Sequence, residues 1–299
     1  CEENDIQLVF LPGDNKPDLE LMQSSNIPLK EVDLIWKYIQ SGGLENCEAA
    51  LQLISNRITE AKVTPNAIKT IPDLFLYHPN EGIYNPSTLQ QEKKQALIFG
   101  YRSYYLSNNL DPVHTIIDTL EAQGISAVAL MAAGYREQDI QQQIFDVLKS
   151  HHLEKPQVII NTTGFSVQGF HDTTQSLFEV FNVPVIQAIM GSCNRESWLE
   201  GSFGLPPTDI AMNIALPEVD GKIITKVISF KESIEKDVLT DSEVVSYVPN
   251  IEGCEFVAQM AKAWINLQLK NNSVKKVALV LPNYPNKNSR LANGVGLDT

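Results

Sequence analysis

The sequence has 299 residues, with 43% hydrophobic residues, 20% charged residues and a formal net charge of −13. Such an acidic chain lacks the basic surface that binds a nucleic-acid backbone or an anionic membrane, which argues against both as partners. No apolar run approaches the roughly 20 residues that cross a bilayer. The composition is typical of a soluble globular protein with about two domains, at roughly 150 residues per domain.

The cysteines and the first residues indicate the compartment. The four cysteines are scattered and form no C-x-x-C pair, which favours reduced thiols over disulfides or a zinc site. The start, Cys1–Asp5, is polar and shows no signal peptide. We therefore expect a cytoplasmic protein. Because the chain does not begin with Met, we also expect that it was cut from a longer protein or trimmed at its start.

Residues 1–94 predict a small α/β region that ends in an irregular connection over residues 64–94. It begins with an apolar run at residues 6–11, and two helices are expected at residues 29–39 and 45–58. Pro12-Gly13-Asp14 is a turn signal after the apolar run, and Gly42-Gly43 separates the helices.

Residues 95–273 predict a doubly wound α/β domain. Strands are expected at residues 96–100, 126–131, 158–160 and 183–189, and helices at residues 111–121, 137–149 and 175–181. Asp111 is expected to cap its helix, with Pro112 in the first turn. This alternation predicts a parallel sheet with helices on both faces, of the Rossmann-like or periplasmic-binding-protein-like kind.

The remainder predicts a further helix, strand and long helix, followed by a truncated domain over residues 274–299. These elements are expected at residues 209–214, 223–230 and 252–269, with a new strand at 277–281. A domain that contains only one strand before the sequence stops is expected to be incomplete.

Ligands of doubly wound sheets bind at the carboxyl ends of the strands. Polar segments follow all four predicted strands, so we expect them on one edge of the sheet: Tyr101–Ser103, Ala132–Gly134, Asn161–Phe165 and Met190–Ser192. The chain has no G-x-x-x-x-G-K-[ST] or G-x-G-x-x-G loop, no H-E-x-x-H and no G-x-S-x-G. The sequence therefore gives no support for nucleotide binding and weakens a hydrolase interpretation.

Several polar groups are candidates for ligand binding, and each has a structural alternative that local chemistry favours. The run Asn161–Phe165 offers hydroxyls and backbone N–H groups to a carboxylate, or is a plain turn. Glu196 stands near Trp198, which packs in the core in the alternative interpretation. Glu218 and Asp220 are two carboxylates before a turn. Arg290 suits a carboxylate, because its guanidinium forms two parallel hydrogen bonds.

Taken together and in order, these segments are specific. Residues 191–231 contain a Glu-Ser-Trp segment, then Gly204-Leu205, then Ala-Leu-Pro-Glu-Val-Asp-Gly at 215–221. This succession resembles the large subunits of aerobic cobaltochelatase and magnesium chelatase. Asn161–Phe165 resembles the threonine-glycine-phenylalanine turn of both. Three segments resemble the cobalt branch: Leu76–Pro79, Leu281–Asn286 and Arg290–Thr299. The resemblance covers essentially the whole chain, as an amino-terminal portion of a much longer subunit.

The resemblance implies an ATP-dependent enzyme that inserts cobalt into hydrogenobyrinic acid a,c-diamide in cobalamin biosynthesis. Mg-ATP would be bound by separate AAA+ partner subunits, and cobalt would be a substrate. Proton removal and metal transfer need carboxylates or imidazoles. Candidates for those roles are His78, Glu196, Glu218 and Asp220. Candidates for substrate binding are Arg102, Asn161, Thr163, Trp198, Asn283, Arg290 and Asn293.

Two other functions remain open. One is a magnesium chelatase large subunit acting in the chlorophyll pathway. The other is a small-molecule-binding module that is not an enzyme. In the favoured interpretation the fragment alone is inactive, and its metal ligands are unknown.

Overall fold

A computed structural model describes residues 6–14, 16–59, 62–84, 95–151, 153, 155–167, 177–202 and 204–281. Contacts between residues divide the chain into two units, Cys1–Lys262 and Ala263–Thr299. Among the described residues, no helix has both the length and the apolar character needed to cross a membrane. The sequence-predicted domain boundaries at 94 and 273 stay predictions.

The first part of the chain is helical, with α1 (Leu19–Gln23), α2 (Leu29–Ser41) and α3 (Leu44–Ile58). The two predicted helices are confirmed as α2 and α3. The turn between them needs positive φ angles at Gly42 (62°) and Gly43 (84°), which glycine adopts without a steric penalty. Met22 and Ile35 are buried where these helices pack together.

The apolar run at residues 6–11 forms no strand. Within the described part of the chain, the backbone there pairs with no strand. It is held instead by Asn26 and by Ser25, whose hydroxyl accepts from the N–H of Phe10 at 2.9 Å. Asn26 accepts from the N–H of Leu8 at 2.6 Å through Oδ1 and donates to the carbonyl of Ile6 at 2.7 Å through Nδ2. Polar side chains thus satisfy the backbone groups that a neighbouring strand would otherwise pair.

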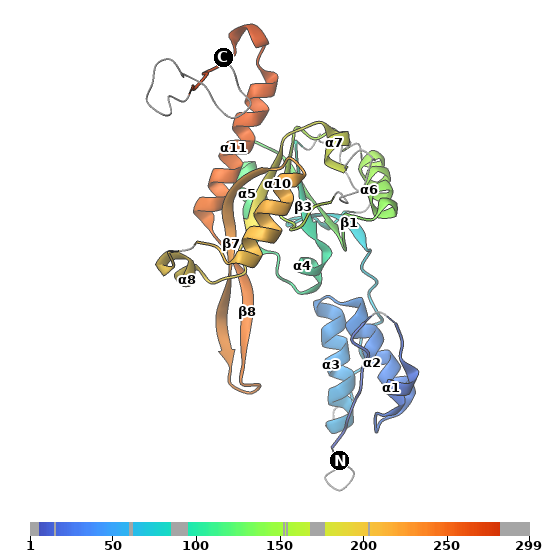
Figure 1. The fold of residues 1–299 in the computed structure, drawn as a ribbon. Helices are drawn as coiled ribbons and strands as arrows, with labels where there is room; N and C mark the ends of the chain where they lie inside the picture. The colour runs from blue at the N-terminus through green and yellow to red at the C-terminus, as the bar shows by residue number, and fades with distance from the viewer. Residues whose placement is uncertain are drawn as a thin grey trace. The chain divides into compact units, whose positions relative to one another are not determined.

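The described residues form an eight-stranded sheet in the order β2-β1-β4-β3-β5-β6-β7-β8 (Figure 1). The strands are β1 (Leu74–His78), β2 (Gly82–Ile83), β3 (Ala96–Tyr101), β4 (Ala127–Ala132), β5 (Val158–Asn161), β6 (Val185–Met190), β7 (Ile223–Asp237) and β8 (Ser242–Pro249). Five neighbouring strands run parallel, in the sheet order β4-β3-β5-β6-β7. In contrast, β1 pairs antiparallel with β4, and β8 pairs antiparallel with β7.

Helices cover both faces of the sheet, which confirms the predicted doubly wound α/β class. On one face, Leu97 and Phe99 of β3 lie in a core cluster with residues of α6 (Gln138–Ser150) and α7 (Leu177–Phe181). The opposite face is covered by α5 (Asp111–Ala122), whose buried side chains include Ile116 and Leu120. The long helix α11 (Ile251–Leu269) begins beside β7, where the Sγ atom of Cys254 contacts the carbonyl of Ile228 at 3.5 Å.

Three local expectations need correction. Residues 74–78 and 82–83 form β1 and β2 rather than an irregular connection. Residues 277–281 form no strand, and their apolar side chains are exposed. Pro112 does lie in the first turn of α5, but Leu110 occupies the capping position, with no side-chain cap.

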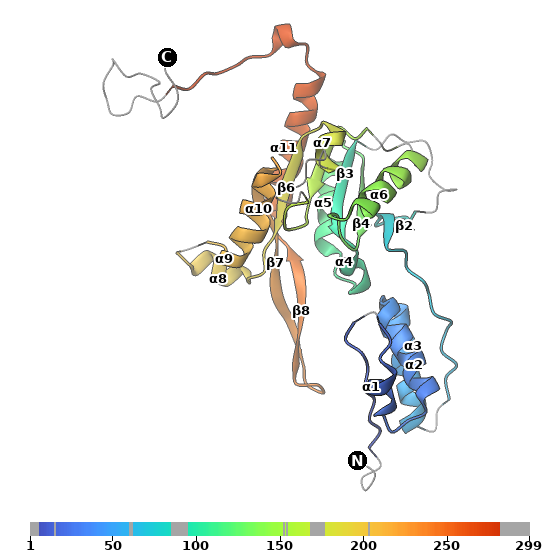
Figure 2. The same ribbon diagram turned by 45° about the vertical axis from the view of Figure 1, so that its right-hand side comes forward.

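The β7–β8 hairpin is longer than the predicted strand at 223–230. Its outer half extends beyond the helix-covered part of the sheet (Figure 2). There the side chains of Val238 and Leu239 are exposed.

Candidate functional site

The carboxyl ends of β3, β4, β5 and β6 lie at one edge of the sheet, because these strands are parallel. Short helices follow two of them: α4 (Arg102–Leu106) after β3 and α8 (Arg195–Glu200) after β6. This is the edge at which doubly wound sheets bind their ligands. The prediction that the segments after these strands share one edge is confirmed.

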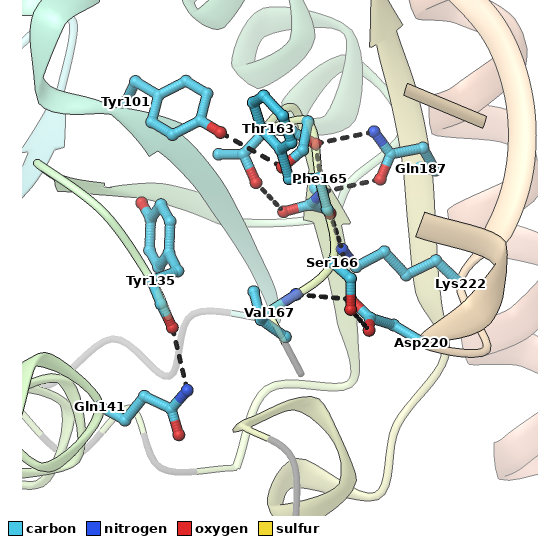
Figure 3. A network of polar contacts seen from close by, with 12 residues as sticks. Tyr101, Tyr135, Gln141, Thr163, Phe165, Ser166, Val167, Gln187, Asp220 and Lys222 are labelled. Carbon is cyan, nitrogen blue, oxygen red and sulfur yellow. Dashed lines mark hydrogen bonds and ion pairs between the residues drawn. The ribbon is translucent and has the colours of Figure 1, made fainter. Parts of the chain in front are cut away.

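A buried polar network joins the end of β5 to the middle of β6 (Figure 3). Asn161 donates through Nδ2 to the carbonyl of Thr163 at 2.8 Å and to Oε1 of Gln187 at 2.7 Å. Gln187 in turn donates to the same carbonyl of Thr163 at 2.9 Å, and the Thr163 hydroxyl donates to Oδ1 of Asn161 at 2.9 Å. All three residues are almost completely buried, so these groups fix the course of the chain after β5.

The loop after this network is held by a buried ion pair. Asp220 and Lys222 lie 3.0 Å apart, with no exposed surface on either side chain. The Asp220 carboxylate accepts hydrogen bonds from the hydroxyl of Ser166 and from the N–H of Val167. Nζ of Lys222 donates to the carbonyl of Phe165 at 3.3 Å. Burial lowers the pKa of Lys222, and the neighbouring Asp220 opposes that shift.

Phe165 adopts a left-handed backbone conformation, with φ of 65°. This conformation costs an L-residue about 1–2 kcal/mol. The N–H of Phe165 donates to the carbonyl of Met212 at 2.7 Å, within the π-helix η2 (Ile210–Ala215). Gly164 lies so close to this π-helix that an added Cβ would come within 3.0 Å of Oδ1 of Asn213. The glycine therefore allows the loop and the π-helix to meet.

A row of tyrosines lines the same edge. The ring of Tyr101 lies 6.3 Å from Tyr135 and 5.8 Å from Tyr104, and Tyr104 lies 6.0 Å from Tyr247 of β8, measured between ring centroids. Burial is the main cause that raises the pKa of each of these phenols. The row therefore presents neutral aromatic groups, and the hydroxyl of Tyr101 donates to the carbonyl of Gly164 at 3.2 Å.

Arg102 and His78 have partners within the fold. The Arg102 guanidinium donates to the carbonyls of Pro72 and Ile71, each at 2.8 Å, and so fixes the segment before β1. His78 is buried, with Nε2 3.2 Å from a carboxylate oxygen of Glu121. Because β1 is antiparallel to β4, His78 lies at the opposite edge of the sheet from Arg102, which follows the carboxyl end of β3.

The other candidates divide into packed, exposed and undescribed residues. Trp198 packs against Phe230, with ring centroids 5.2 Å apart, which matches the core alternative. Glu196, on α8, and Glu218 are exposed. Three candidates lie outside the described residues: Asn283, Arg290 and Asn293. The structure thus brings Asn161 and Thr163 together and places Asp220 against the loop that follows them. The roles of these residues toward substrate stay predictions.

Sequence reasoning missed several residues that shape this edge. Gln187 had a detectable signal, because it is a polar residue inside the apolar run 183–189. Lys222 had a weaker one, since a lysine two residues after Asp220 more often lies in solvent. Among the described residues, no group of three or more His, Cys, Asp or Glu side chains is arranged to hold a metal ion.

Comparison with known proteins places this fold. The family described as CobN/Magnesium Chelatase matches residues 36–299. The chain is 34% identical to the aerobic cobaltochelatase subunit CobN of Pseudomonas aeruginosa, over 99% of this chain and 24% of that protein. It is 23% identical to a magnesium-chelatase subunit of Chlorobaculum parvum, over 89% of this chain and 21% of that protein.

A solved structure has the same fold. It is the catalytic subunit of cobaltochelatase from Mycobacterium tuberculosis, with a TM-score of 0.69 and 22% identity, covering 95% of this chain and 23% of that one. The chain thus spans about a quarter of the length of the relatives it matches. On the near-complete match of its sequence, the chain belongs to the CobN/magnesium chelatase family.

Proposed function

We propose that this chain is a tetrapyrrole-binding portion of the large subunit of an aerobic cobaltochelatase. The observation that carries the proposal is the alignment of nearly the whole chain with a cobaltochelatase subunit, at higher identity than with a magnesium-chelatase subunit. In this proposal the subunit takes part in inserting cobalt into hydrogenobyrinic acid a,c-diamide. The reaction forms nitrogen–metal bonds and takes place in the cytoplasm.

The energy for insertion would come from partners. We propose that AAA+ subunits bind and hydrolyse Mg-ATP, because the chain has no phosphate-binding loop. Cobalt would arrive as a substrate rather than as a resident cofactor. The fragment alone would then carry neither ATPase nor chelatase activity.

The edge described above suits binding better than proton transfer. Its buried polar groups, including Asn161 and Thr163, are paired with one another. Its aromatic row is neutral and apolar, and a corrin is a flat, largely apolar ring system with polar groups at the periphery. Groups for that periphery would come from the exposed Glu196 and Glu218 and, in the proposal, from Arg290. An Arg–carboxylate contact in a buried site contributes about 1.5–3 kcal/mol.

The proposal is tested by titrating the purified chain with two tetrapyrroles, hydrogenobyrinic acid a,c-diamide and a porphyrin, while following tryptophan fluorescence. We expect saturable binding of the corrin and weaker binding of the porphyrin. Preference for the porphyrin would instead support the magnesium chelatase alternative. Binding of neither compound would contradict a tetrapyrrole-binding role and favour a module for another small molecule.

A further inference from the structure

Phe165 combines a strained backbone with an exposed ring. Its φ angle is 65°, yet half of the residue (50%) remains exposed to solvent. Residues are held in such conformations only where the surrounding structure fixes them, and these positions cluster at functional sites. Because half of the residue is exposed, burial in the core does not explain why the chain keeps this conformation.

The conformation is fixed from both sides by groups already described. The N–H of Phe165 donates to Met212, and its carbonyl accepts from Lys222. The next two residues are bound by Asp220. These bonds tie Phe165 to three points on η2 and on the segment after it, so the ring is presented in a defined place.

The carbonyl of Met212 is available for a reason that can be traced to the sequence. In the π-helix each carbonyl accepts from the N–H five residues later, as Ala211 does from Leu216. The residue five after Met212 is Pro217, which has no N–H. The proline therefore leaves one helix carbonyl free, and the N–H of Phe165 occupies it.

We propose that Phe165 is a stacking residue for the flat face of the tetrapyrrole, and that Asp220 and Lys222 position it. This inference rests on the proposed function and specifies which residue of the chain contacts the ligand. An exposed aromatic ring stacks on a conjugated ring system, and the fixed backbone lowers the entropy lost when the ring is ordered on binding. The site is at the carboxyl edge of the parallel strands, beside the tyrosine row.

The test uses hydrogenobyrinic acid a,c-diamide titrated into four variants of the chain, with the melting temperature of each measured in parallel. Phe165→Ala and Phe165→Gly remove the ring, whereas Phe165→Tyr keeps it. Phe10→Ala removes a phenylalanine of similar exposure (37%) from the helical part of the chain and serves as the matched control. Phe165→Gly is the most informative variant, because glycine adopts a positive φ without strain.

We expect both ring-removing variants to weaken binding about tenfold, while Phe165→Tyr and Phe10→Ala stay within about twofold of the wild type. Phe165→Gly should melt at or above the wild-type temperature. If the wild-type chain binds the corrin and Phe165→Ala binds equally well, the stacking role is wrong and the proposed function stands. If Phe165→Gly melts well below the wild type while its folded fraction binds normally, the ring has a structural role only. If the wild-type chain does not bind the corrin, both proposals fail.

Discussion

The carboxylate of Asp220 and the ammonium of Lys222 lie 3.0 Å apart and are both completely buried. Such a pair contributes little net stability, because desolvation offsets much of the attraction between the charges. The pair instead holds the loop in one conformation, because each charge also binds backbone or hydroxyl groups of residues 165–167. Asp220 of the Pro-Glu-Val-Asp-Gly segment of the family resemblance, together with Lys222 directly after that segment, is thus linked to the turn after β5.

Asp220→Asn should therefore be far more damaging than Glu218→Gln. The first substitution leaves the buried Lys222 without a counter-charge, which costs about 3–5 kcal/mol. The second alters an exposed side chain, and such changes usually stay within about 0.5 kcal/mol. Urea denaturation of the two variants measures the difference. Equal stabilities would show that the ion pair does not fix this loop.

Pro217→Ala should loosen the loop after β5. An alanine there restores an N–H that competes with Phe165 for the carbonyl of Met212. Loss of that bond is expected to cost about 1 kcal/mol and to raise the exchange rate of the Phe165 amide about fivefold. Hydrogen exchange resolved at single residues measures this rate. Unchanged protection of Phe165 would contradict the competition.

His114 should contribute to the pH dependence of stability. Its Nε2 lies 2.8 Å from the Tyr77 hydroxyl, and the neutral ring can accept that hydrogen bond. Burial is the main cause that lowers the pKa of His114 below its usual 6.5. As the pH falls, the unfolded chain therefore protonates His114 before the folded chain does. The contribution of neutral His114 to the free energy of unfolding is complete above pH 6.5 and is lost as pH falls through the lower folded-state pKa.

The corresponding variant is His114→Gln, which keeps a hydrogen-bonding group without a titration in this range. The fall in the free energy of unfolding between pH 7 and pH 5 should be shallower in the variant than in the wild type. Urea denaturation at several pH values gives both slopes. A variant slope as steep as that of the wild type would assign the pH dependence to other groups.

The chain alone should hydrolyse no ATP and insert no cobalt. The reason is the absence of any phosphate-binding loop in its sequence. The assay combines the purified chain with ATP, cobalt and hydrogenobyrinic acid a,c-diamide, and follows phosphate release and the corrin absorbance. Clear phosphate release that increases with chain concentration would contradict the proposed division of labour between subunits.

The repeating part of the fold was predictable, because β3 to β6 are short apolar runs separated by helices of ordinary length. Strand β1 was not, because its polar surroundings resemble a loop and its partner β4 lies about fifty residues away in the sequence. The run at residues 6–11 is apolar, yet the described part of the chain places no strand beside it. The side chains of Asn26 and Ser25 bind its backbone groups instead.

At the candidate site, the sequence located the edge but not the role of each side chain. A parallel sheet places the segments after its strands together, so the edge follows from the alternation alone. Whether a polar group faces a ligand or another polar group depends on tertiary contacts. Asn161 donates a hydrogen bond to Gln187, a residue 26 positions away, and Arg102 donates hydrogen bonds to carbonyls before β1. No local pattern contains those partners.

The position of β1 also bears on how the chain can be divided. Every residue of β4 is buried, and β1 covers the side of β4 that β3 leaves open. A protein beginning at residue 95 would present β4 as a bare apolar edge with unpaired backbone groups. Such edges recruit strands from other molecules. Truncation there would therefore promote aggregation, whereas a boundary placed before Leu74 keeps the protecting strand.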